Sequence, residues 1–183
     1  MMLPSLHRIL QDATGDYYDD YLKQAGEILM NIGMIIEGLG SSQAKNISLL
    51  ISKHNDLMRK IVKEIASVSI EEASRLVVLA GLILNLKRAI EALDAISFLF
   101  EGSGESLEAQ RKNVKEASEI LLKAFGNLKT RREKELDDVL SRFKLLKMTL
   151  GGIDRIRSNT IAILVYKMAY NGYCIARVAR GLV

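Results

Sequence analysis

Residues 76–86 read Leu-Val-Val-Leu-Ala-Gly-Leu-Ile-Leu-Asn-Leu, the longest stretch of the chain without a charged side chain. A helix built from it has apolar residues on nearly every side, so it must be buried by neighbours on several sides. Residues 160–176 predict a second helix of this kind. The first stretch has 11 residues, whereas a membrane-spanning helix needs roughly 20. The two stretches therefore predict the central helices of a bundle with no transmembrane segment.

The composition excludes several other classes of protein. Of the 183 residues, 49% are hydrophobic and the net charge is only +4, which excludes a disordered chain. A single Cys excludes a disulfide scaffold and a Cys-rich zinc fold, and it is typical of a reducing compartment. One Pro and 13 Gly are too few turn residues for a β-sandwich or barrel. Because the N-terminus lacks a signal-peptide pattern, we expect a soluble, cytoplasmic, all-α protein.

Helical periodicity runs through almost the whole chain, and residues that start or stop helices divide it into six segments. Ser69 and Glu72 form a Ser-x-x-Glu capping box that predicts the start of the third helix. Glycines at residues 38–40, 102–104 and 151–152 predict three breaks between helices. The expected helices cover residues 16–37, a segment that starts at Ser41 or Ser42, and residues 69–100, 106–126, 129–150 and 153 onwards.

The six helices repeat one plan, in which two amphipathic helices are followed by one that is apolar on nearly all sides. We therefore expect a six-helix bundle made of two tandem three-helix bundles. The whole chain, residues 1–183, would form a single all-α domain with repeats over 14–102 and 105–183.

Charge is distributed unevenly along the chain. Residues 1–40 carry two basic and six acidic side chains, a net charge of −4. Residues 106–150 carry 11 basic and seven acidic side chains, a net charge of +4, and residues 151–183 carry five and one, again +4. A basic C-terminal half could meet acidic lipid head groups or nucleic acid. The chain has no compact Lys/Arg block with interleaved aromatic residues, which disfavours nucleic acid as the partner.

Three segments of the chain carry a family resemblance. They are residues 52–61, Ser-Lys-His-Asn-Asp-Leu-Met-Arg-Lys-Ile; residues 69–76, Ser-Ile-Glu-Glu-Ala-Ser-Arg-Leu; and residues 154–162, Asp-Arg-Ile-Arg-Ser-Asn-Thr-Ile-Ala. These segments resemble the PhoU-like family of prokaryotic phosphate uptake and transport regulators. The resemblance covers about residues 14–183 and implies two three-helix bundles side by side. It also implies a non-enzymatic regulator that self-associates and acts by contact with a transporter or sensor component.

The resemblance further implies metal binding through Glu/Asp-x-x-x-Asp pairs, in which two carboxylates four residues apart lie on one helical face. Among the helices that carry these pairs in the family, only the fifth keeps one here, formed by Glu133 and Asp137. Two other helices keep one acid of the pair: Asp56 follows Ser52 in one, and Asp154 precedes Ser158 in the other. Any divalent or iron site would therefore be centred on Glu133 and Asp137.

Two alternatives to a regulatory function, each from a different class of protein, remain open. One is a metal-binding carboxylate bundle, again with Glu133 and Asp137 as its first ligands. The other is a bundle that binds a membrane surface or nucleic acid through its basic C-terminal half, with an affinity that falls as salt rises.

Other residues with potentially reactive side chains are assigned structural roles. His54 lies on the apolar side of its helix, so we expect it to be buried and bonded to a neighbouring helix rather than to act as a base. Cys174 has no activating base nearby and is expected to be a small buried side chain. The acids in Asp16-Tyr17-Tyr18-Asp19-Asp20-Tyr21 suit the start of a helix, where they complement its dipole.

Overall fold

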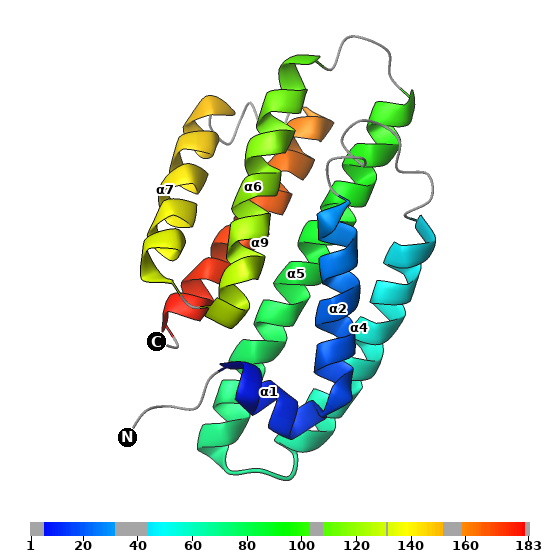
Figure 1. Cartoon of the computed structure of the whole chain (residues 1–183), viewed down its shortest axis with the longest axis vertical. Helices are drawn as coiled ribbons and strands as arrows, with labels where there is room; N and C mark the ends of the chain where they lie inside the picture. The colour runs from blue at the N-terminus through cyan, green and yellow to red at the C-terminus, as the bar shows by residue number, and fades with distance from the viewer. Residues whose placement is uncertain (1–5, 32–43, 103–107, 131, 152–158, 182–183) are drawn as a thin grey trace.

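The computed structural model describes residues 6–31, 44–102, 108–130, 132–151 and 159–181. These residues form helices and contain no strand (Figure 1), which confirms the expected all-α class. The seven helices are α1 (Leu6–Thr14), α2 (Asp16–Met30), α4 (Ala44–Ile65), α5 (Ile70–Gly102), α6 (Glu108–Thr130), α7 (Glu133–Thr149) and α9 (Thr160–Gly181).

The two helices at the centre of the bundle are α5 and α9, as the apolar stretches predict. They run antiparallel and pack against each other (Figure 1). Helices α2 and α4 cover α5 from one side, while α6 and α7 cover α9 from the other. Within each group every helix contacts the other two: α2, α4 and α5 pack mutually, and so do α6, α7 and α9. No helix in the described ranges is long and apolar enough to cross a membrane.

The covering helices bury an apolar side, as expected of amphipathic helices. On α4 the buried residues include Leu50, Leu57 and Ile61, and on α7 they include Leu136 and Val139. The prediction for α5 was wrong at its N-terminal end, because Val77 is 58% and Val78 43% exposed. In its first turns α5 extends past part of the surrounding bundle, so the apolar side chains on its outer side face solvent (Figure 1).

A seventh helix, α1, occupies the segment before residue 16, where none of the six predicted helices lies. It packs on α2, α4 and α5. The turn into α2 depends on Gly15, whose φ of 57° lies in the left-handed region that glycine adopts without strain. The Gly15 N–H donates to the Gln11 carbonyl at 2.7 Å. Because α1 is only 9 residues long, its stability must come from packing rather than from intrinsic helix propensity.

Helix α2 ends at Met30, earlier than the predicted end at Glu37. The side-chain amide of Asn31 donates to the Glu27 carbonyl at 2.8 Å, and its backbone N–H donates to the Ile28 carbonyl at 3.2 Å. Asn side chains compete with the helical hydrogen-bond ladder in this way and favour helix ends. The predicted stop at residues 38–40 and the predicted cap at Ser41 or Ser42 lie outside the described residues.

The boundary between α6 and α7 lies a few residues later than predicted. Helix α6 continues through Gly126 to Thr130, and α7 starts at Glu133 rather than near Lys129. Asn127 fixes the turn, because its Nδ2 donates to the Lys123 carbonyl and to Glu135 Oε2, both at 2.9 Å, and its Oδ1 accepts from the Arg132 N–H at 2.9 Å. This buried amide therefore links the end of α6 to the start of α7.

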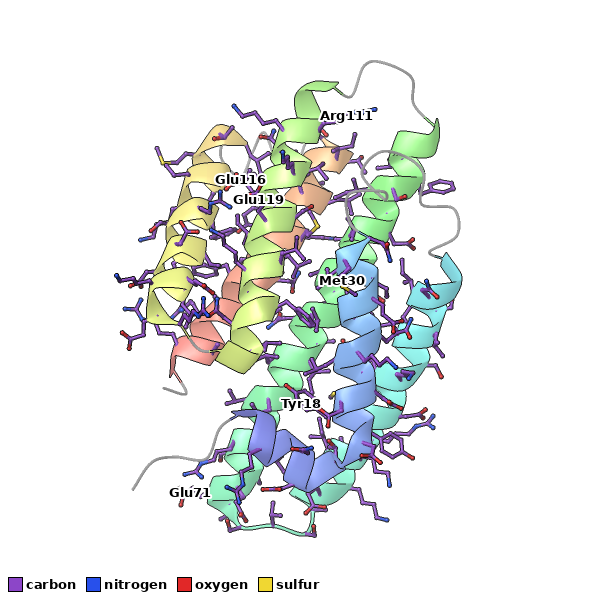
Figure 2. All side chains as sticks on the ribbon, in the orientation of Figure 1. Tyr18, Met30, Glu71, Arg111, Glu116 and Glu119 are labelled. Atoms are coloured by element: carbon purple, nitrogen blue, oxygen red, sulfur yellow. The ribbon has the colours of Figure 1, made fainter. Side chains whose placement is uncertain are left out.

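Charged side chains join α6 to α7 further along. Figure 2 shows Glu116 and Glu119 on the side of α6 that faces α7. The Arg142 guanidinium on α7 lies 3.5 Å from Glu116, 2.7 Å from Glu119 and 3.7 Å from Asp138. The hydrogen bond with Glu119 raises the pKa of Arg142, so the cation is retained at any ordinary pH.

Candidate functional site

The predicted metal pair lies on the outer surface of α7. Glu133 is exposed in the first turn of the helix. Asp137 is also exposed, and its Oδ1 lies 2.8 Å from Arg180 Nη1 on α9. This ion pair gives Asp137 a structural partner, because it connects the last turn of α9 to α7. A metal ion would have to compete with Arg180 for that carboxylate.

The structure does not bring Asp56 near this pair. Asp56 lies on α4, on the opposite edge of the bundle from α7 (Figure 1), and its nearest cation is Arg59 at 3.7 Å. Asp154 falls outside the described residues. Among the residues that are described, no group of three or more His, Cys, Asp or Glu side chains could hold a metal ion. Metal binding by Glu133 and Asp137 stays a prediction, which metal analysis of purified protein and of Glu133→Ala would test.

His54 is buried between α4, α2 and α5. Only 6% of the residue is exposed, and its ring lies 5.9 Å from the ring of Tyr21. Its Nδ1 is 3.5 Å from Asn55 Oδ1, while Nε2 has no hydrogen-bond partner in the described part of the chain. The burial expected of His54 is confirmed, but a bond to a neighbouring helix is not found. Burial lowers the pKa of His54, so the ring is neutral at pH 7.

The Asp- and Tyr-rich segment at residues 16–21 starts α2, as expected. Tyr18 and Tyr21 are fully buried. Tyr17 is 44% exposed and lies beneath the Lys60 ammonium, 4.9 Å from the ring centre. Asp20 pairs with Lys53 at 3.5 Å. The segment therefore joins α2 to α4 and α5 through contacts that stabilise the fold.

A groove of about 480 Å³ lies along the seam between α5 and α9. We call it the α5–α9 groove. Residues three, four and seven apart lie on one helical face, so matched faces of the two antiparallel helices form it. The lining residues are Asn85, Arg88, Glu91 and Ala92 from α5, and Leu164, Lys167, Tyr170 and Asn171 from α9.

Positive charge dominates the groove. Arg88 and Lys167 are exposed, and neither has an ion-pair partner within the described residues. Among the lining residues that the structure describes, Glu91 is the only acid, and its carboxylate is 2.8 Å from Lys87. That pair is internally neutral, so the two unpaired cations set the local charge at about +2. Such a site attracts anions.

Aromatic rings continue along one side of the groove. Tyr170 lines the groove and is 43% exposed. Its ring is stacked on Tyr166 at 5.8 Å between centres and on Tyr173 at 6.2 Å. Phe143 of α7 stacks on Tyr173 at 4.6 Å. These four rings, the α9 aromatic cluster, fix the position of Tyr170 and leave part of its ring open to solvent.

Cys174 is adjacent to this cluster and is only partly buried, not fully buried as predicted. It shares a hydrogen bond with Tyr170, which raises the pKa of that phenol. Desolvation raises the pKa of the Cys174 thiol. The thiol is therefore protonated near pH 7, which fits a packing role better than nucleophilic chemistry.

The sequence contained a signal for the groove that its apolar pattern concealed. Asn85, Arg88, Lys167 and Asn171 interrupt the two most apolar helices. Asn171 is only 7% exposed, and its Nδ2 donates to the Lys167 carbonyl at 2.6 Å. Polar residues within helices that are otherwise buried on all sides indicate a site, but only the packing of α5 on α9 places them together.

No protein-family model, no curated protein and no solved structure matches this chain.

Proposed function

We propose that this protein is a non-enzymatic regulator or adaptor of the PhoU-like kind, which acts by contact with a transporter or sensor component. The observation that carries the proposal is the packing pattern: α2, α4 and α5 contact one another, α6, α7 and α9 do the same, and α5 meets α9 between them. Two tandem three-helix bundles would give this pattern. The three sequence segments that resemble the family add to it.

Exposed apolar side chains at the start of α5 offer a surface for the partner. Ile70 is 88% and Val77 58% exposed. They are seven residues apart and therefore lie on the same side of the helix. Water-exposed apolar groups of this size gain about 25 cal/mol per Å² when a partner covers them. Self-association through this surface is a further expectation of the proposal.

Chemical crosslinking in the source cells, followed by purification of a tagged chain at its native level, tests the proposal. We expect enrichment of a transporter or sensor subunit, with direct binding when both proteins are purified. The double variant Ile70→Asp, Val77→Asp should weaken that binding. The matched control is Leu145→Asp, Met148→Asp on α7, where both side chains are also exposed. If no such subunit is enriched, the regulator proposal fails.

A further inference from the structure

We propose that the α5–α9 groove is a binding site for a nucleotide, meaning a small molecule that combines a phosphate group with a planar ring. This inference is independent of the regulator proposal, because it depends on the groove alone. It assigns a ligand class to Arg88 and Lys167, whose side-chain charges have no ion-pair partner within the described residues.

The phosphate would be held by the two unpaired cations, one from each central helix. Arg88 offers a planar fork of N–H donors and Lys167 a compact ammonium, and both groups are common phosphate ligands. Neither is neutralised within the described residues, since Glu91 is paired with Lys87 at 2.8 Å. An anion therefore replaces no existing ion pair when it binds between Arg88 and Lys167.

The volume of the groove suits an organic ligand that is larger than a phosphate ion. Clefts that hold organic ligands measure about 300–1,000 Å³, and this one measures about 480 Å³. Tyr170 supplies a partly exposed ring at the groove, held in place by stacking on Tyr166 and Tyr173. A rigid exposed ring of this kind is the usual platform for a nucleobase.

Amide and carboxylate groups complete the match to a nucleotide. Asn85 and Asn171 line the same groove as the cations. Asn171 is 93% buried, since its exposed fraction is 7%, so its side chain is fixed before any ligand arrives. The second oxygen of Glu91 can accept a hydrogen bond from a sugar hydroxyl, and the two amides can both donate to and accept from sugar hydroxyls or base edges.

Isothermal titration of the purified chain at low salt with AMP, GMP, CMP and UMP tests the proposal, with adenosine and inorganic phosphate as separate arms. We expect saturable binding of at least one nucleotide, and weaker binding of adenosine and of phosphate alone. Arg88→Gln and Lys167→Gln should each weaken nucleotide binding about tenfold, as loss of a charge-assisted hydrogen bond does. Lys144→Gln and Lys147→Gln, which remove exposed charges on α7 away from the groove, should leave it unchanged.

The role of the Tyr170 ring is tested by a second pair of variants, one at the groove and one control. Tyr170→Leu should weaken nucleotide binding about fivefold or more and leave phosphate binding unchanged. Tyr17→Leu, which changes an equally exposed tyrosine on α2 that does not line the groove, should change neither. Circular dichroism of each variant controls for folding. The proposal is overturned if none of the four nucleotides binds saturably, if phosphate alone binds as tightly as the best nucleotide, or if the α7 variants weaken binding as much as the groove variants.

Discussion

The hydroxyl of Tyr21 on α2 donates a hydrogen bond of 3.2 Å to the backbone carbonyl of Ile83 on α5. Both residues are fully buried, and 62 positions separate them in the sequence. Burial, together with the nearby Glu91 carboxylate, raises the pKa of Tyr21 far above its usual range, so the phenol remains a donor. This contact links the covering helix α2 to the central helix α5.

Removal of that hydroxyl should lower stability measurably. We expect Tyr21→Phe to reduce the free energy of unfolding by about 1 kcal/mol, the usual net value of an intramolecular hydrogen bond. Tyr17→Phe is the control, because Tyr17 is 44% exposed and its hydroxyl can be hydrated. Urea denaturation followed by circular dichroism measures both. Equal losses in the two variants would contradict a specific role for the Tyr21–Ile83 bond.

Stability should fall as the pH drops below the ordinary pKa of His, through His54. Its pKa is lowered in the folded state, first by burial and also by the nearby Lys87 charge. At pH values between the pKa of His54 in the folded chain and its unfolded value of about 6.5, His54 is protonated in the unfolded chain but mostly neutral in the folded one. His54 therefore stabilises the fold fully above pH 6.5 and loses that contribution as the pH falls towards its folded pKa.

Urea denaturation across this pH range, in the wild type and in His54→Gln, measures the effect. The groups that face His54 are Tyr21 from α2 and Lys87 and Glu91 from α5. The two proteins differ only in this side chain, so the difference between their pH profiles isolates the imidazole. We expect a smaller loss of stability in the variant between pH 6.5 and pH 5. Parallel pH profiles would show that His54 is not the titrating group.

Local signals in the sequence predicted local structure well. The capping box at the start of α5 is present, since the Glu72 N–H donates to Ser69 Oγ at 3.3 Å and that hydroxyl donates to Glu72 Oε2 at the same distance. The long helix that follows ends at Gly102, as its glycines indicate. Such features depend on residues three or four apart, which a sequence displays directly.

Features that depend on contacts between helices were not predictable. Asn127 sets the boundary between α6 and α7 through its hydrogen bonds to Arg132 and Glu135. In the sequence, however, nothing distinguishes it from other polar residues. The α5–α9 groove likewise requires the register of two helices whose lining residues lie more than 70 positions apart. Asp137 was predicted as a metal ligand, but no local pattern indicates that Arg180 on another helix lies beside it.

The charged cluster around Arg142 should contribute a salt-dependent part of the stability. Its guanidinium contacts Glu116 and Glu119 on α6 and Asp138 on its own helix. The four side chains are 26–41% exposed, so water screens the pairs and their combined value stays modest. We expect Arg142→Gln to cost about 1 kcal/mol at low salt and clearly less at high salt. A loss that does not change with salt would contradict an electrostatic origin.

Two glycines in the central helices should respond to alanine in opposite directions. A Cβ at Gly172 on α9 would lie 3.2 Å from Leu121 Cα and 3.2 Å from Ile120 Cγ2 on α6. Backbone atoms cannot move aside as a flexible side chain can, so α9 and α6 would have to separate. A Cβ at Gly81 on α5 would meet no atom within 4 Å. The same substitution therefore tests close packing at one site and helix propensity at the other.

For Gly172→Ala we expect a net loss of about 1 kcal/mol or more, because overpacking of 1–3 kcal/mol outweighs the better helix propensity of alanine. For Gly81→Ala we expect a gain of about 0.5–1 kcal/mol, since only the propensity and the entropy of the unfolded chain change. Thermal and urea denaturation measure both. A stabilised Gly172→Ala would mean that α6 and α9 do not approach as closely as the structure has them, because the propensity gain could then be realised without a clash.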